Sequence, residues 1–313
     1  MDNKFLSSDK IDYINCLNKI MNVWLESGEK IVLLENTEGG IANKVLKLTT
    51  NYNNKYIFKI YKKIRNQTLP FELMKYLRNN NINVAFPINE IPIMFENTEC
   101  YLYDYIEHTT SFISDELEQF LMKLLKIISE FNTKIANEEY FYKSKCDREF
   151  ELLKNKKHYK LNEKIITNVL DKYQAIRNLP INNKKEVVHS DISTSNLLKT
   201  DKGYCLIDFD EVRFTSKIYD LCVILVKFFF NGREIDFNGA RKFALKYLEV
   251  FREYDSMDCY NVFVYYVVKQ LLEKFSDYEI FNIDIYSEQQ QRDDFRNWIY
   301  YFENLELIKK IFI

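Results

Sequence analysis

One histidine, two aspartates and one asparagine lie close together in the second half of the chain. They are His189, Asp191 and Asn196, in the pattern His-x-Asp-x-x-x-x-Asn, followed on the next predicted hairpin by Asp208. A carboxylate can orient a hydroxyl group and accept its proton, while amide and carboxylate oxygens are ligands that Mg²⁺ prefers. This combination suits phosphoryl transfer, in which a hydroxyl group attacks a metal-bound phosphate.

The segment around these residues predicts a strand–loop–strand unit over residues 187–210. Val187 and Val188 form an apolar strand before the loop, and Cys205-Leu206-Ile207 forms another directly before Asp208. The returning hairpin brings Asp208 back to the loop that carries the other side chains. The alternative is that these residues lie in two polar surface loops. The correct spacing of Asp191, Asn196 and Asp208 between apolar strands makes this alternative the weaker one.

The first third of the chain predicts an N-terminal helix and a sheet with one further helix. Strands are expected over residues 31–34, 45–48, 56–61, 84–93 and 100–106, and helices over 9–25 and 70–78. Gly39-Gly40 marks a tight turn, and Lys59 lies inside a strand. After residue 108 the pattern is mainly helical: around 120–131, over 149–178, and from 218 to the end. We therefore predict two lobes, residues 1–106 and 107–313, which share a hinge without a flexible linker.

Composition excludes several classes of function. The 313 residues carry 44 Lys and Arg against 46 Asp and Glu, a net charge of −2, which gives no basis for broad nucleic-acid binding. No cysteine pair has CxxC spacing, so a structural zinc site is not expected. The longest apolar run, 221–230, is interrupted by Lys227 and is too short to span a bilayer. The first residues do not resemble a signal peptide, so we expect a cytoplasmic protein without a membrane partner.

The segments from about residue 30 to 225 together resemble the aminoglycoside phosphotransferase and choline kinase-like family. The resemblance implies an α+β, bilobal protein-kinase-like fold with a small antiparallel-sheet N-lobe and a mainly helical C-lobe. It also implies that Asp191 is the catalytic base, that Asn196 and Asp208 bind Mg²⁺, and that His189 is structural. Asp220 matches a family aspartate that begins a helix and braces the catalytic loop.

The same resemblance implies an ATP site in the first lobe. Lys59 matches the lysine that contacts the ATP phosphates, and Glu72 matches the helix glutamate that pairs with it. The resemblance also implies a nucleotide loop at Gly39, Gly40 and Asn43. It implies an adenine-binding hinge at Asp104, Tyr105 and Ile106. An ordinary strand lysine at position 59 and a solvated glutamate at 72 are the alternatives.

Three segments depart from the family pattern. Ser190 stands where the family usually has glycine, Ser193-Thr194-Ser195 fills a stretch that often holds proline or glycine, and Gly39-Gly40 falls short of a full GxGxxG motif. None of these changes removes a charged catalytic group. They concern the geometry of the loops.

The expected activity is ATP- and Mg²⁺-dependent phosphorylation of a hydroxyl on a small molecule: an antibiotic, amino alcohol, amino acid or sugar. A protein kinase is disfavoured because the chain between Asp208 and Asp220 has no room for a peptide-docking segment. A catalytically silent kinase-like protein with a structural or binding role, for example in a spore coat, is the alternative from another class. The acceptor, ATP versus GTP, the oligomeric state and the participation of Asp210 stay open.

Acidic residues in the C-terminal helices leave the charge of the acceptor open. These residues could bind a cationic acceptor or be ordinary solvated helix charges. They are Asp255, Asp258, Glu273, Asp293 and Asp294.

Overall fold

A computed structural model of the protein describes residues 14–37 except 16, 20, 23 and 26, and residues 43–61, 67–95, 98–109, 114–135, 145–281, 283 and 289–313. The chain forms two compact units. The first comprises Met1–Thr110 and Leu198–Ile207, and the second comprises Ser111–Leu197 and Asp208–Ile313. The hairpin segment 198–207 thus belongs to the first unit. The predicted division into residues 1–106 and 107–313 places this segment in the second lobe.

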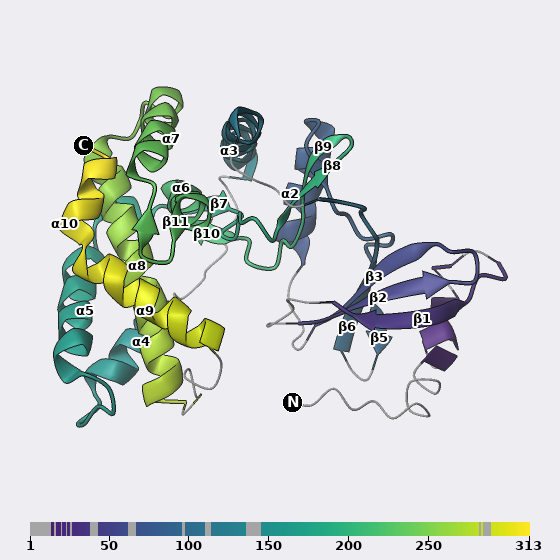
Figure 1. The fold of residues 1–313 in the computed structure, drawn as a ribbon, viewed down its shortest axis with the longest axis horizontal. Coiled ribbons are helices and arrows are strands. Elements are labelled where there is room, and N and C mark those ends of the chain that lie inside the picture. Colours follow the sequence, from purple (N-terminus) through teal and green to yellow (C-terminus); the bar gives the residue numbers. More distant parts are fainter. Residues whose placement is uncertain are drawn as a thin grey trace. The chain divides into compact units, whose positions relative to one another are not determined.

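An antiparallel five-stranded sheet forms the first unit's framework (Figure 1). Its order is β1-β2-β3-β6-β5, with bounds Ile31–Asn36, Lys44–Thr50, Lys55–Ile60, Thr98–Asp104 and Ile93–Phe95. Alternating strand residues turn one face inward. The core on that face contains Leu17, Met21, Leu25, Ile31, Leu34, Leu46, Leu48, Phe58, Ile60, Cys100 and Leu102.

Helix α2 and a smaller sheet complete the first unit. Helix α2, Thr68–Asn79, buries five side chains along one face: Pro70, Phe71, Leu73, Met74 and Leu77. Strand β4, Asn83–Val84, pairs in parallel with β9, Gly203–Leu206, which lies next to β8, Leu197–Thr200. The strand predicted over 84–93 is reduced to β4 and β5, because the intervening Pro87 and Pro92 cannot donate to a ladder.

The second unit is mainly helical. Its α-helices are α3 Asp115–Ile135, α4 Lys145–Lys154, α5 Glu163–Ile176, α6 Ile218–Ile224, α7 Phe237–Val250, α8 Ser256–Glu279, α9 Gln289–Glu303 and α10 Leu305–Ile308, with 3₁₀ turns at Pro180–Asn183 and Lys309–Ile311. Helix α8 packs against α4, α5, α6 and α9. Strands β7, Glu186–Val188, and β10, Arg213–Thr215, pair antiparallel and frame the loop that follows β7.

Two predicted helical stretches are interrupted. The stretch 149–178 divides into α4 and α5, because Asn162 accepts hydrogen bonds from the backbone of Lys164 and Ile165 and caps a new helix. The region after 218 contains a π-helical turn, Leu225–Phe229, and a hairpin of β11, Phe230–Asn231, with β12, Glu234–Ile235. The Asn231-Gly232 pair is a hairpin signal, and Gly232 has φ 62°. No helix in the described part is both long and apolar enough to cross a membrane.

Candidate active site

The loop after β7 is held by a buried carboxylate. Asp220, in the first turn of α6, accepts hydrogen bonds from the backbone N–H of His189 at 2.9 Å and of Ser190 at 2.7 Å. Its side chain is almost fully buried. Burial raises the pKa of Asp220 to about 6, although both backbone donors favour the charged form. Asp220 therefore fixes the backbone immediately before Asp191.

His189 lies inside the protein and supports the loop from the other side. Its ring is fully buried and meets the Phe209 ring edge-on, with ring centroids 4.7 Å apart. The backbone N–H of Asp191 donates to His189 Nδ1 at 3.3 Å, which requires Nδ1 to be unprotonated and the ring proton to sit on Nε2. This geometry gives His189 contacts with the loop backbone.

Asp191 and Asn196 meet across the loop. Asn196 Nδ2 donates to Asp191 Oδ2 at 2.7 Å and to the Asp191 carbonyl oxygen at 3.0 Å. The amide group is therefore oriented with Oδ1 turned away from Asp191, and no hydrogen bond from a described residue reaches that oxygen. Asp191 Oδ1 is likewise left without a donor among the described residues. The pair presents two unused oxygen atoms.

The charge environment favours a basic Asp191 carboxylate. Burial raises the pKa of Asp191, and the negative charges of Asp208 and Glu211 act in the same direction. The positive charge of Lys227 and the hydrogen bond from Asn196 oppose this shift. A carboxylate with a raised pKa accepts a proton more readily than an exposed aspartate. Glu211 and Lys227 were not predicted as site residues from the sequence, although Lys227 is the charge that interrupts an apolar run.

Asp208 is the third predicted oxygen donor of this unit. It is exposed, has φ 60°, and its Oδ1 lies 3.5 Å from the backbone nitrogen of Asp210. Among the described residues no cluster of three or more His, Cys, Asp and Glu side chains could hold a metal ion. An Asn–Asp pair still fits Mg²⁺, which usually keeps waters and binds phosphate oxygens alongside one or two protein groups.

In the first unit, the predicted lysine and glutamate are not brought together. Lys59 on β3 is buried, and its Nζ lies 5.2 Å from the centroid of the Tyr61 ring. Glu72 lies on the exposed face of α2 between the buried side chains Phe71 and Leu73. No hydrogen bond or ion pair joins Glu72 to a described residue. Because Glu72 lies on the exposed side of α2, the implied Lys59–Glu72 pair is not formed.

The predicted nucleotide loop is described only at its end. Gly39 and Gly40 lie outside the described residues, while Asn43 is buried directly before β2. In the predicted hinge, Tyr105 lies close to two lysines, with Lys47 Nζ 4.8 Å and Lys55 Nζ 5.6 Å from its ring centroid.

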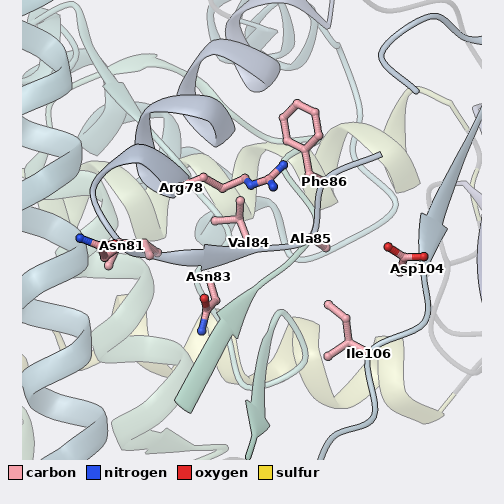
Figure 2. Close-up of a pocket in the computed structure, with 9 residues that line it drawn as sticks. Arg78, Asn81, Asn83, Val84, Ala85, Phe86, Asp104 and Ile106 are labelled. Carbon is pink, nitrogen blue, oxygen red and sulfur yellow. The ribbon is translucent and has the colours of Figure 1, made fainter. Parts of the chain in front are cut away.

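Asp104 and Ile106, the other two hinge positions, face a hollow (Figure 2). This hollow has a volume of about 450 Å³, within the usual range for small-molecule sites. Arg78, at the end of α2, lies 5.1 Å from the Phe86 ring on the same hollow. The first unit thus offers a partly polar hollow beside the predicted hinge.

The acidic residues considered for a cationic acceptor are engaged within the fold. Asp255 and Asp258 form the capping box of α8. Asp294 pairs with Lys274 at 2.5 Å, Asp293 with Arg296 at 3.8 Å, and Glu273 with Lys269 at 3.9 Å. Because each has a partner or a capping role, these acids do not form an unpaired anionic surface.

The profile of the phosphotransferase enzyme family (APH) matches residues 34–260, which is most of the chain and includes both groups of predicted site residues. The chain belongs to this family. The match spans β1 to the first turn of α8, and the predicted recognition of the family is therefore confirmed. No curated protein sequence matches the chain.

Solved structures of similar fold agree with this assignment. Spectinomycin phosphotransferase APH(9)-Ia, in complex with ADP and spectinomycin, is 17% identical with a TM-score of 0.62, covering 96% of this chain and 97% of that chain. Choline kinase from Cryptosporidium parvum Iowa II is 15% identical with a TM-score of 0.61, covering 96% of each. LicA in complex with AMP is 14% identical with a TM-score of 0.57, covering 96% and 99%. The predicted fold class is confirmed: a five-stranded antiparallel sheet followed by a mainly helical region.

Proposed function

We propose that this phosphotransferase-family protein transfers the terminal phosphoryl group of ATP, with Mg²⁺, to a hydroxyl of a small molecule. The observation that carries the proposal is the pairing of Asp191 with Asn196, which leaves one oxygen of each side chain available. Family membership and the raised pKa of Asp191 add support. Similar folds are known in complex with ADP, AMP and GDP, which favours a nucleotide as the donor.

Within this proposal each residue of the loop has one task. Asp191 Oδ1 accepts the hydrogen bond of the acceptor hydroxyl and takes its proton as the oxygen–phosphorus bond forms. Asn196 holds Oδ2 and so fixes the direction of Oδ1. Asp220 and His189 keep the backbone in place. Asn196 Oδ1 and the Asp208 carboxylate would hold Mg²⁺, which neutralises phosphate charge when bound.

The first unit supplies the proposed nucleotide contacts. Lys59 is buried on β3, where a fixed positive charge can bind phosphate oxygens. Asp104 and Ile106 border the hollow beside the hinge and are proposed, with Tyr105, to contact the base. Asn43 and the Gly39-Gly40 turn keep their predicted roles as part of the same proposal.

A catalytically silent kinase-like protein is the second candidate, because one observation favours it. The exposed Glu72 forms no pair with Lys59, and such a pair is expected in an active enzyme of the family. The retention of Asp191, Asn196 and Asp208 at the same loop favours the enzyme.

The two candidates differ in nucleotide binding and turnover. We expect a non-hydrolysable ATP analogue with MgCl₂ to raise the melting temperature, and the analogue with EDTA to raise it much less, because ligands of the folded state stabilise it. Asp208→Asn should lose the Mg²⁺-dependent part of the shift. The exposed Asp201→Asn, in the β8–β9 turn, should keep it.

ADP release with ATP, Mg²⁺ and a panel of amino alcohols, amino acids, sugars and aminoglycosides then identifies the acceptor class. Stimulation by one class supports the kinase. A chain that shows neither a Mg²⁺-dependent shift with ATP or GTP analogues nor any ADP release is the silent protein, and the catalytic roles given above are then wrong.

A further inference from the structure

Ser190 has a backbone conformation that a serine rarely adopts. It lies between His189 and Asp191 with φ 68°, in the left-handed region. For a residue with a Cβ atom this conformation costs about 1–2 kcal/mol, whereas glycine adopts it without that penalty. Ser190 is also buried, with 7% of its surface exposed. A serine at this position therefore needs interactions that a glycine would not need.

The side chain of Ser190 has one such interaction. Arg213 Nε donates a hydrogen bond to Ser190 Oγ over 2.8 Å. On the backbone side, the N–H of Ser190 donates to Asp220 at 2.7 Å. The residue directly before Asp191 is thus held by both its main chain and its side chain. A bond from a charged donor to a buried hydroxyl is among the stronger hydrogen bonds in proteins.

Arg213 is itself fixed independently of Ser190. It belongs to β10, where it pairs with Val188 of β7, the residue before His189. Its Nη2 donates to Glu211 Oε2 at 2.9 Å, and its guanidinium carbon lies 5.5 Å from the centroid of the Tyr219 ring. The guanidinium therefore approaches Ser190 from a position that strand pairing, an ion pair and an aromatic ring already define.

We propose that Arg213 is a positioning residue for the phosphoryl transfer: it holds Ser190 in the left-handed conformation and thereby fixes the direction of Asp191. In this chain the Ser190–Arg213 hydrogen bond offsets the cost of the left-handed conformation, a cost that a glycine at this position would not have. The proposal rests on the proposed function, since Asp191 has to be the base for its direction to matter.

The test is a cycle of three variants: Ser190→Gly, Arg213→Met and both together. Arg213→Met removes the donor but keeps an unbranched side chain beside Tyr219. We expect it to lower kcat about tenfold, the equivalent of one charge-assisted hydrogen bond, and to change KM for ATP less than about twofold. Ser190→Gly alone should stay within about twofold of the wild type, because it loses the bond and the backbone penalty together.

The decisive result is rescue. Arg213→Met and the double variant both lack the partner of Glu211, so the difference between them reports only on Ser190. We expect the double variant to recover kcat to within about threefold of the wild type, since glycine adopts the left-handed conformation without help. Arg252→Met, which removes an exposed arginine whose Nε donates to the Glu249 carbonyl, is the matched control and should not change kcat.

A double variant as slow as Arg213→Met, or slower, overturns the proposal, because Arg213 would then act without Ser190. All rates are measured well below the melting temperature of the least stable variant. Should the wild type show no turnover with any nucleotide, the proposed function fails, and with it the positioning role. The melting temperatures then still decide whether the contact exists: if it does, Ser190→Gly should raise the melting temperature of Arg213→Met by about 3 °C and change that of the wild type much less, and if it does not, Ser190→Gly should change both by the same amount.

Discussion

The loop around Asp191 and the surroundings of Lys59 differ in how many of the predicted side-chain contacts are formed in the structure. In the loop, Asp220, His189 and Asn196 all contact the segment that carries Asp191. In the first unit, Lys59 is buried but Glu72 faces solvent. The loop depends on residues that are close in the chain or lie on the strands and helix that frame it. The lysine site depends on the orientation of a whole helix, which local spacing does not determine.

Loss of the Asp191 carboxylate should have a larger effect than any other substitution proposed for this protein. Asp191→Asn removes the proton acceptor and keeps the size of the side chain, so we expect kcat to fall about 100-fold or more while nucleotide binding stays intact. Single-turnover ADP release and the melting-temperature shift with an ATP analogue measure the two quantities. Near-normal turnover in this variant, with Asp201→Asn as the exposed control, would show that Asp191 is not the base.

The next prediction concerns pH and the buried brace. The pKa of Asp220 is raised from its ordinary value to about 6 in the folded chain, so the folded state binds a proton more tightly than the unfolded state. This group contributes stability that is complete below about pH 4 and is lost as the pH rises through 6, by up to about 3 kcal/mol. Urea unfolding of the wild type and Asp220→Asn between pH 4 and 7 measures the difference.

The variant lacks this titration, so the unfolding free energy of the wild type relative to that of Asp220→Asn should fall over this range and then level off. A difference that is constant with pH contradicts the raised pKa. A difference that rises with pH contradicts its direction.

A smaller effect is expected at the first unit. Lys59→Met removes a buried positive charge that is proposed to bind phosphate, so the Kd for ATP should rise about 30-fold, the equivalent of a charge-assisted hydrogen bond of about 2 kcal/mol. Isothermal titration with the Mg²⁺ complex of an ATP analogue gives the value. Lys75→Met is the matched control, because Lys75 is exposed on α2 and pairs with the exposed Glu90 at 2.6 Å. Equal affinities for wild type and Lys59→Met would remove Lys59 from the site.

A substitution of Glu72 should have almost no effect. Glu72→Gln should change kcat and KM for ATP less than about twofold, because Glu72 is exposed and makes no ion pair with a described residue. Steady-state kinetics at low ionic strength is the measurement. A tenfold or larger loss would mean that the Lys59–Glu72 pair forms during turnover and that the two regions are equally well assembled in the active state.

Much of the fold could be predicted from sequence because its signals are local. Short apolar runs predicted β1 to β3, and the apolar repeat around 120–131 predicted α3. The hairpin at Asn231-Gly232 was missed although the dipeptide is a strong turn signal, because the apolar run before it favoured a continuous helix. The division of 149–178 at Asn162 was missed for a similar reason. The whole stretch was predicted as one helix, and Asn162 was not recognised as a helix cap.

The candidate site divides in the same way. The spacing from His189 to Asn196 was informative because a loop of that length brings its own ends together. Arg213 could not be predicted, because its contact with Ser190 depends on the pairing of β10 with β7. The exposure of Glu72 could not be predicted either, since both faces of α2 offer positions for a glutamate.

The left-handed backbone at Ser190 also limits the order in which this protein can change. If Arg213 holds the serine, a descendant that loses the arginine first passes through a slow enzyme. One that first replaces Ser190 with glycine then becomes free to vary position 213. The two substitutions lower kcat in one order and preserve it in the other. The φ angle of Ser190 therefore determines which order of substitution keeps the enzyme active.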